Sequence, residues 1–331
     1  MNDRTVSLFD NYELSIQRTR KGRGSIIAET DQGMKILTEF QGYKEKAVFL
    51  ESAMNRIKEN GYPYIDFFLR NKDGEIVTTD HDGRQYVVKD YLPGRECNVR
   101  DRTECGRAAQ ALATLHDCMR HLGAEEQNVP SGEVILCEFD RKNALLKRVR
   151  SFMRKCPAKT DFELLFLKEF ERFWCQTQAA DACLTKELVD ALIRDITQNA
   201  SYCHGDCSHH NLLMADGHVN IVNFEKLRAD TPLKDLSHFL RKVLEKNEWN
   251  FSYASVILQT YSQIRPLSGA DHSYVFGRLT YPEKFVKIAG SYLGQRKSLP
   301  AKRQLDKLSS LIDMEAARDD FLLEYQTRYL S

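Results

Sequence analysis

The residues with the richest chemistry lie together in YCHGDCSHHNLLM, residues 202–214. This segment holds three histidines, two cysteines, an aspartate and an asparagine, so it could build a metal site, a thiol site or a loop for phosphate chemistry. Its histidines lack the HExxH spacing of a zinc helix, and its cysteines lack the spacing of a zinc knuckle. A nucleophilic Cys207 paired with a histidine finds no second supporting element in the sequence.

The spacing of three polar residues favours phosphate chemistry. His204, Asp206 and Asn211 form the pattern H-x-D-x4-N, and the kinase catalytic loop H-R-D-x-x-x-x-N has the same step from Asp to Asn. In that loop the Asp accepts the proton of the attacking hydroxyl, and the Asn holds a magnesium ion beside the phosphates. A hairpin at 212–222 follows and ends in IVNFEK, where Asn223 occupies the position expected for a metal-binding acid.

The same residues also have an ordinary structural interpretation. His204 could be a core histidine with satisfied hydrogen bonds, while Asp206 and Asn211 could simply cap turns. Asp235 precedes an apolar stripe, and a role as a helix N-cap explains it fully. Bracing the loop at 202–214 is an additional role that Asp235 could have.

Strands and one helix are predicted before this segment. RGSIIAET and MKILTEF flank a short loop in which Gly33 is placed for positive φ. Residues 65–92 predict about three more strands, with Asp-Gly turns at 73–74 and 82–83. Between these groups, residues 44–59 carry apolar side chains at helical spacing.

The rest of the chain is predicted to be mainly helical, apart from the hairpin at 212–222. Apolar stripes recur at helical spacing, and Thr160 and Glu163 have the spacing of a capping box. The sequence therefore predicts an α+β, bilobal protein-kinase-like fold. Residues 1–94 would form a small antiparallel-sheet lobe with one helix, and residues 95–331 a large, mainly helical lobe.

Bulk properties give no argument for nucleic-acid or membrane partners. Among 331 residues, 48 Lys and Arg nearly balance 47 Asp and Glu, so no global field steers the protein to nucleic acid or anionic lipid. No apolar run approaches the roughly 20 residues of a membrane span, and the N-terminus lacks the apolar core of a signal peptide. The nine cysteines are odd in number and contain no CxxC pair, which indicates reduced thiols and folding in the cytosol.

Several segments resemble known families. YCHGDCSHHNLLM resembles the HGDxxxxN loop of aminoglycoside phosphotransferases and choline kinases, and ALATLH and YVVKDYLPG are similar to the helix and interlobe hinge of that superfamily. GRGSIIAETDQGMKIL, KDYLPGRECNVRDR, VNFEKLRADTPLKDLSHFLRKVLEKNEW and LTYPEKFVKIAGSYL are similar to the CotS family of spore coat proteins. This second resemblance runs from about residue 12 to residue 328 and is the narrower of the two.

The resemblance implies a kinase-like fold, a spore-forming bacterium and deposition in the spore coat after synthesis in the mother cell. It implies ATP and Mg²⁺ as candidate cofactors, and a nucleotide, other coat proteins and an unknown small-molecule acceptor as partners. Asp206 takes the catalytic base position and Asn211 a magnesium-ligand position. Asp90 and Leu92 fall where hinge backbone groups would meet adenine.

Further positions follow the superfamily incompletely. Gly22 and Gly24 fall in the phosphate-covering loop, which is short and basic, and a plain hairpin turn would also use them. Glu51 is the candidate acid of the helix at 44–59, although it could equally be a solvated surface charge. A phosphate-binding lysine is expected at the position of Thr38. Lys35 could replace it, but the odd step between the two residues puts their side chains on opposite faces of the strand.

The expected metal site also departs from the pattern. Asn223 replaces an acid, so it could coordinate Mg²⁺ without neutralising the charge of the ion, and Glu225 could supply a carboxylate instead. Losing a lysine contact and an anionic ligand removes several kcal/mol of transition-state stabilisation, at roughly tenfold in rate per 1.4 kcal/mol. The sequence therefore favours a nucleotide-binding scaffold with weak or no phosphotransfer. The alternative is an active ATP- and Mg-dependent phosphotransferase acting on a small hydroxyl or amine compound.

Overall fold

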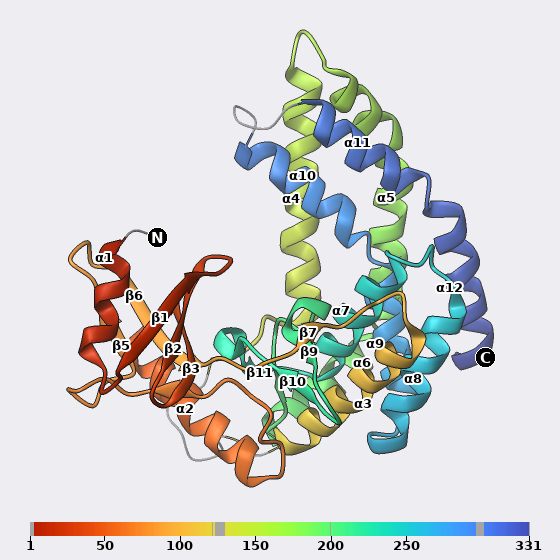
Figure 1. The fold of residues 1–331 in the computed structure, drawn as a ribbon. Coiled ribbons are helices and arrows are strands. Elements are labelled where there is room, and N and C mark those ends of the chain that lie inside the picture. Colours follow the sequence, from red (N-terminus) through yellow and green to blue (C-terminus); the bar gives the residue numbers. More distant parts are fainter. Residues whose placement is uncertain (1–2, 121, 123–129, 199, 296–300, 331) are drawn as a thin grey trace. The chain divides into compact units, whose positions relative to one another are not determined.

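The computed structural model describes residues 3–330 except 121, 123–129, 199 and 296–300 (Figure 1). The chain forms two compact units. The first comprises residues 1–132, 195–239 and 263–265, and the second comprises 133–194, 240–262 and 266–331. The first unit thus holds the predicted sheet together with the segment at 202–214, so the compact units do not divide at residue 94. The boundary at residue 94 stays a prediction about the functional lobes.

A six-stranded sheet forms the N-terminal part of the first unit. Its pairings are antiparallel, and the strand order is β1-β2-β3-β6-β4, with β5 also pairing to β6. The strands are β1 (Ile16–Lys21), β2 (Ser25–Thr30), β3 (Gly33–Glu39), β4 (Phe68–Leu69), β5 (Val77–Thr79) and β6 (Gln85–Asp90). The predicted strands are confirmed, and Gly33 has the predicted positive φ, +85°. The sequence prediction missed β1.

The register of β2, β3 and β6 defines the two faces of this sheet. Residues opposite each other in a ladder point to the same face, and neighbours along a strand point to opposite faces. We name the faces after Leu37 and Thr38 of β3. The Leu37 face includes Ile26, Ala28, Lys35, Val88 and Asp90, and the Thr38 face includes Ile27, Ile36, Val87 and Lys89.

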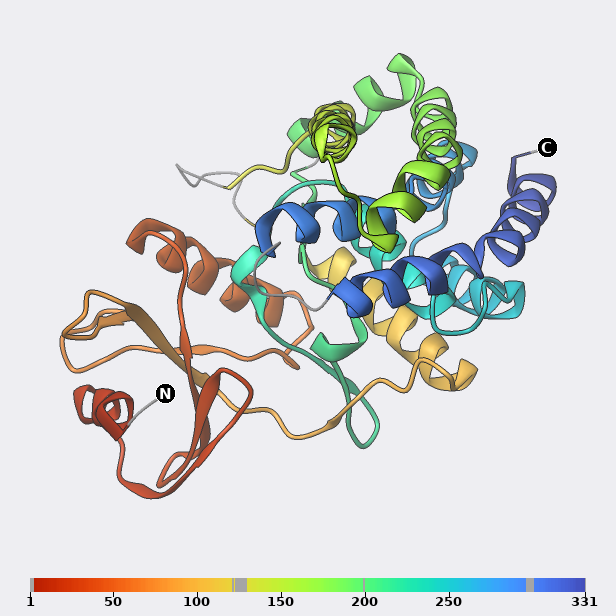
Figure 2. The same cartoon turned by 90° about the horizontal axis from the view of Figure 1, so that it is seen from above.

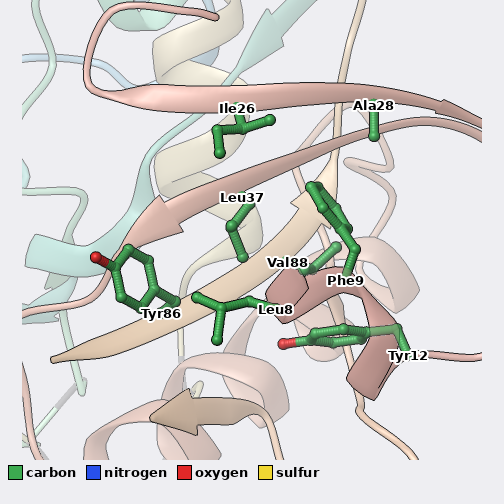
Figure 3. Packing of buried hydrophobic residues seen from close by; sticks show 8 residues of the cluster. All are labelled: Leu8, Phe9, Tyr12, Ile26, Ala28, Leu37, Tyr86 and Val88. Carbon is green, nitrogen blue, oxygen red and sulfur yellow. The ribbon is translucent and has the colours of Figure 1, made fainter. Parts of the chain in front are cut away.

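A short N-terminal segment covers the Leu37 face. It consists of α1 (Asp3–Val6) and the 3-10 helix η1 (Ser7–Asn11), neither of which the sequence predicted. Its Leu8, Phe9 and Tyr12 pack against strand residues in the cluster that Figure 3 shows, and all members of that cluster are buried. The Tyr12 hydroxyl also lies 3.0 Å from the Thr78 hydroxyl, which ties the segment to β5.

The predicted helix at 44–59 is α2 (Lys44–Glu59). Its Leu50, Ala53, Met54 and Ile57 are buried, as their spacing predicted. Figure 2 shows the strands lying between α2 and the N-terminal helical segment. The sheet is therefore covered on both sides by helix.

The rest of the first unit carries small sheets and short helices. β7 (Arg95–Glu96), β9 (Leu212–Met214) and β10 (Val219–Ile221) form one sheet, and β8 (Tyr202–Cys203) pairs with β11 (Arg228–Ala229). The hairpin predicted at 212–222 is β9 and β10. The helical elements are α3 (Arg102–Cys118), η2 (His209–Asn211), η3 (Phe224–Lys226) and the beginning of α7 (Leu233–Leu244).

The second unit is built from helices around an aromatic core. Phe285 stacks on Phe166 and Phe173, with ring centroids 4.6 and 4.1 Å apart. The predicted capping box is present, because the Thr160 hydroxyl accepts from the Glu163 backbone and the Glu163 carboxylate accepts from the Thr160 backbone. The helices of this unit are α4 (Ile135–Lys155), α5 (Asp161–Cys183), most of α6 (Lys186–Gln198), α8 (Phe251–Ile264), α9 (Gly269–Thr280), α10 (Glu283–Gln295), α11 (Ala301–Ile312) and α12 (Glu315–Tyr329).

Two further observations concern the predictions about membrane spans and cysteines. None of the helices that the structure describes is both long and apolar enough to cross a membrane. All nine cysteines are free; Cys137 and Cys175 are exposed, whereas Cys203 and Cys207 are buried. Burial raises the pKa of both the Cys203 and the Cys207 thiol, which fits their interpretation as packing residues.

Candidate nucleotide and metal site

The loop at 202–214 makes a sharp bend at Gly205. Its φ is +82°, and a Cβ there would lie 2.4 Å from the Lys226 carbonyl oxygen and 2.5 Å from an Arg228 guanidinium nitrogen. Only glycine fits this combination of left-handed backbone and close approach. β8 leads into the bend and pairs with β11, so the bend is hydrogen-bonded to the segment that follows Asn223 and Glu225.

His204 orients the backbone of the loop. Its ring is fully buried, and Nε2 lies 3.1 Å from the Val222 carbonyl oxygen while Nδ1 accepts from the Asp206 backbone N–H at 3.2 Å. A neutral ring with its proton on Nε2 satisfies both contacts. The ring also meets Phe224 edge-on, with centroids 4.6 Å apart. His204 is thus a satisfied core histidine, and it holds Asp206 in place as well.

Asp235 braces the same loop from α7. Its carboxylate accepts from the backbone N–H groups of His204 and Gly205 at 2.6 and 2.9 Å, and it lies 3.2 Å from His116 Nε2. Burial opposes the charge, but these hydrogen bonds outweigh it and lower the pKa of Asp235. The N-cap interpretation was wrong, because α7 already begins at Leu233 and the carboxylate bonds to another segment.

Asp206 and Asn211 lie on opposite sides of one turn. The Asn211 side-chain amide donates to the Asp206 carbonyl oxygen at 2.8 Å, and its Oδ1 accepts from the Asn223 side-chain amide at 2.8 Å. The Asp206 carboxylate is about one-third exposed and forms an ion pair of 2.8 Å with Lys226. The structure therefore brings the Asp206 backbone and the Asn211 and Asn223 side chains together, while their roles as catalytic base and metal ligands stay predictions.

A buried lysine from β6 completes this group. Lys89 Nζ lies 2.7 Å from Asp66 Oδ2, 2.6 Å from Glu225 Oε1 and 3.2 Å from Asn223 Oδ1. A lysine ammonium carries three N–H donors, and each of them has an acceptor here. Burial disfavours the charge, but Asp66 and Glu225 raise the pKa of Lys89 above its usual range. Lys89 is therefore a fully satisfied internal cation.

Asp66 and Glu225 respond differently to this lysine. Burial raises the pKa of Asp66, and Lys89 offsets that effect only in part, although the Asn223 backbone N–H also donates to both Asp66 oxygens at 3.1 Å. Lys89 lowers the pKa of Glu225 despite the opposing effect of burial. With both acids ionised, the cluster of Asp66, Lys89 and Glu225 carries one net negative charge.

This arrangement does not fit a bound magnesium ion as it stands. The oxygen ligands expected from the sequence were Asn211, Asn223 and Glu225, and each already accepts a hydrogen bond: Asn211 from the Asn223 amide, and the other two from Lys89. A metal ion bound by Asn223 Oδ1 and Glu225 Oε1 would compete with the Lys89 ammonium for these oxygens. Lys89 and Asp66 were missed in the sequence, although a lysine after the buried Val87 and Val88 of one strand is a visible signal.

Lys35 and Thr38 point to opposite faces, as the sequence predicted. Lys35 lies on the Leu37 face and pairs with Asp90 at 2.6 Å, so it is not part of the Lys89 cluster. Thr38 shares its face with Lys89, and its buried hydroxyl finds no hydrogen-bond partner among the described residues. A role for Lys35 at a nucleotide phosphate stays a prediction, and this geometry does not favour it.

The remaining predicted nucleotide-site residues have other partners or lie in other elements. Glu51 of α2 accepts from Arg70 Nε at 2.9 Å, so its partner is an arginine and not a strand lysine. The Asp90 backbone N–H at the hinge donates to the Phe67 carbonyl oxygen at 2.9 Å. Gly22 and Gly24 lie in the β1–β2 turn, and Leu92 is half-buried just after β6. Their nucleotide roles stay predictions.

Comparison with known proteins places the chain in a family. A family model described as "Spore coat putative kinase YutH" matches residues 5–325. The chain belongs to this family. The match to the YutH family covers nearly all of the sequence, and spore coat protein S of Bacillus subtilis (strain 168) is 21% identical over 323 residues, or 93% of this chain and 88% of that protein. The predicted resemblance to spore coat proteins is confirmed.

Solved structures show the same fold for this YutH-family member. An aminoglycoside phosphotransferase from Alicyclobacillus acidocaldarius has a TM-score of 0.85 at 17% identity, covering 99% of this chain and 96% of that one. Spectinomycin phosphotransferase, solved with ADP and spectinomycin, has a TM-score of 0.67 at 12% identity, covering 95% and 96%. The predicted α+β kinase-like fold, with an N-terminal antiparallel sheet and a helical C-terminal part, is confirmed.

Proposed function

We propose that this chain is a spore coat protein whose kinase-like fold binds a nucleotide, with ATP as the candidate, and transfers phosphate weakly or not at all. The family match supports the coat role. The fold and the H-x-D-x4-N spacing of the loop support nucleotide binding, since a protein of the same fold has been solved with ADP. Synthesis in the mother cell and assembly with other coat proteins belong to the same proposal.

One observation carries the proposal of weak or no transfer. All three donors of Lys89 are occupied by Asp66, Glu225 and Asn223, and two of these are the residues that should hold a metal ion. Phosphoryl transfer needs cations aimed at the phosphate oxygens. A lysine saturated by protein acceptors cannot donate to a phosphate, and it also competes with Mg²⁺ for Glu225. We therefore expect weak or no transfer, since neither Lys89 nor an ion held through Glu225 and Asn223 could meet the phosphate oxygens while these contacts persist.

A second function has its own supporting observation. The Asp206 carboxylate remains about one-third exposed, and Lys226 lies 2.8 Å from it on the same surface. A carboxylate base with an adjacent cation is what an active phosphotransferase would present to a hydroxyl or amine acceptor. This alternative requires Lys89 to release Glu225 when nucleotide and Mg²⁺ bind. The acceptor would be a small molecule of as yet unknown identity.

Thermal unfolding with ATP, ADP and a non-hydrolysable ATP analogue, each with and without Mg²⁺, tests the proposal. We expect ATP to raise the melting temperature in both conditions, because the Lys89 ammonium already occupies the acceptors that would otherwise hold an ion. At 100 times the Kd the stabilisation would be about 2.7 kcal/mol. No ATP should be consumed over hours with a panel of hydroxyl and amine acceptors.

Two variants of one hairpin region separate the alternatives. Asp206→Asn removes the candidate base, and Asp216→Asn changes an exposed aspartate in the β9–β10 turn as a matched control. ATP turnover that is lost in the first variant and kept in the second would overturn the scaffold proposal in favour of the enzyme. If ATP has no effect on unfolding in any condition, nucleotide binding is refuted. Antibody detection in coat extracts of spores from the native organism tests the localisation.

A further inference from the structure

Two neighbouring histidines of the loop at 202–214 lie close to a glutamate of β7. His209 and His210 are the first two residues of η2, and Glu96 lies at the end of β7. One ligand atom from each side chain can be chosen so that all three lie within 4.8 Å of one another. Among the residues that the structure describes, no other group of three or more His, Cys, Asp or Glu side chains meets this condition.

An ordinary ion pair accounts for only part of this arrangement. His210 Nδ1 lies 2.7 Å from Glu96 Oε2, which a single His–Glu pair would explain. The His209 ring lies against the His210 ring, with centroids 3.9 Å apart and planes inclined by 35°. One nitrogen of each ring also lies within 4.8 Å of a Glu96 carboxylate oxygen, which the His210–Glu96 pair alone does not require. Neutral imidazole is the form that binds metal ions.

The backbone holds these side chains at their positions. Glu96 stands opposite Leu213 in the β7–β9 ladder, and the next residue, Cys97, donates its N–H towards the carbonyl oxygens of His209 and Leu212 at 3.3 and 2.9 Å. The strand that carries the carboxylate is thus hydrogen-bonded to the turn that carries the imidazoles. A tetrahedral ion with bonds near 2.1 Å needs donors roughly 3.4 Å apart, so the three side chains would have to move closer together than they are here.

We propose that Glu96, His209 and His210 form a binding site for a divalent transition-metal ion, with zinc as the preferred candidate. Two imidazole nitrogens and one carboxylate oxygen match the ligands that Zn²⁺ takes, whereas Mg²⁺ prefers oxygen ligands alone. The side chains of Glu96 and His210 are about half exposed, so an ion can enter and water can fill a fourth position. This site is separate from the Lys89 cluster and does not rest on the proposed nucleotide function.

The location gives the ion a structural effect on the loop. η2 ends at Asn211, whose amide bonds the Asp206 carbonyl oxygen and the Asn223 side chain. An ion that joins η2 to β7 would restrain the turn between Asp206 and Asn211. Bound metal would therefore raise the stability of the loop without contacting either residue.

Cobalt titration of the full chain tests the site, because Co²⁺ replaces Zn²⁺ and gives a visible absorption that depends on coordination. Exposed thiols are first alkylated so that cysteines do not compete for the ion. We expect one saturable site whose spectrum shows nitrogen and oxygen ligation, and displacement of the cobalt by zinc. Zinc should also raise the melting temperature of the apo protein.

The His209→Gln/His210→Gln double variant should bind at least roughly tenfold more weakly and lose the zinc-induced stabilisation. His218→Gln is the matched control, because His218 lies in the β9–β10 turn and stacks on Tyr64. Glu96→Gln, at an exposed position, gives a second weakened variant should the double variant unfold. The proposal is overturned if the wild-type chain shows no saturable cobalt spectrum up to about 1 mM, or if the double variant binds as tightly as the control.

Discussion

Replacing Lys89 by methionine removes the internal cation while keeping most of the side-chain volume. The Lys89 and Asp66 side chains are only 1% and 4% exposed, so water cannot compensate the Asp66 carboxylate, whereas Glu225 is 25% exposed. Breaking a buried ion pair by deleting one partner typically destabilises a protein by about 3–5 kcal/mol. At about 2–4 °C per kcal/mol, the melting temperature should fall by roughly 6–20 °C. Urea unfolding, followed by fluorescence and circular dichroism, measures the same loss.

A divalent cation should reverse part of this loss. With both acids ionised, the cluster changes from one net negative charge to two when Lys89 is removed, and two carboxylates with the Asn223 oxygen are ligands that Mg²⁺ or Ca²⁺ accepts. Magnesium at 100 times its Kd would restore about 2.7 kcal/mol. The wild-type protein should gain no such stabilisation, since its ammonium already occupies the position.

Lys35→Met provides the matched control for this experiment. Lys35 is also buried, but it pairs with the single carboxylate of Asp90, which is one-third exposed. We expect a loss of only about 1 kcal/mol there and no effect of magnesium. If Lys89→Met costs no more than Lys35→Met, or if magnesium stabilises both variants equally, the assignment of Lys89 as a replacement for a metal ion is refuted.

Three further predictions concern the loop, its brace and the thiols. Gly205→Ala should lower the free energy of unfolding by at least about 2 kcal/mol. Gly217 has a similar φ but no atom within 4 Å of an added Cβ, so Gly217→Ala should lower it by about 1 kcal/mol. Comparable losses in urea unfolding would contradict the close approach at Gly205. The lowered pKa values of His116 and Asp235 mean that the unfolded chain binds more protons in acid, so the free energy of unfolding should fall below about pH 6.5 and more steeply below about pH 4. Asp235→Asn should reduce the fall in the free energy of unfolding below about pH 4. A wild-type free energy of unfolding that rises on acidification would refute the assignment to these two groups. A thiol reagent should modify the two exposed cysteines quickly in the native protein and all nine only in urea, and rapid native labelling of all nine would show that the buried thiols are accessible.

Local patterns were sufficient to predict most of the fold. The Asp-Gly turns, the apolar stripe of α2 and the hairpin after Asn211 depend on neighbours in sequence, so spacing revealed them. η1 is too short for a periodic signal, and it is held by tertiary contacts such as that of Phe9 with the sheet. β1 escaped detection because its side chains are almost all exposed and polar, as at an edge strand.

The candidate site was predictable only where one segment supplies it. The spacing of Asp206, Asn211 and Asn223 places them together through one turn and one hairpin. Lys89 and Asp66 contact Asn223 from other parts of the chain. Both lie more than 130 residues before Asn223, so no local sequence pattern links them to it. The N-cap interpretation of Asp235 failed for the same reason, because its partners His204, Gly205 and His116 lie 31, 30 and 119 residues away.

The segment before β1 has a practical consequence for handling the protein. Leu8, Phe9 and Tyr12 shield the apolar side chains of the Leu37 face, and each buried side chain of this size contributes about 1.5–3 kcal/mol (Figure 3). Deleting the first dozen residues would expose the apolar side chains of this face beside the unpaired edge of β1. A truncated protein would then be prone to aggregate during purification. Affinity tags are therefore better joined through a linker that leaves the N-terminal segment packed on the sheet.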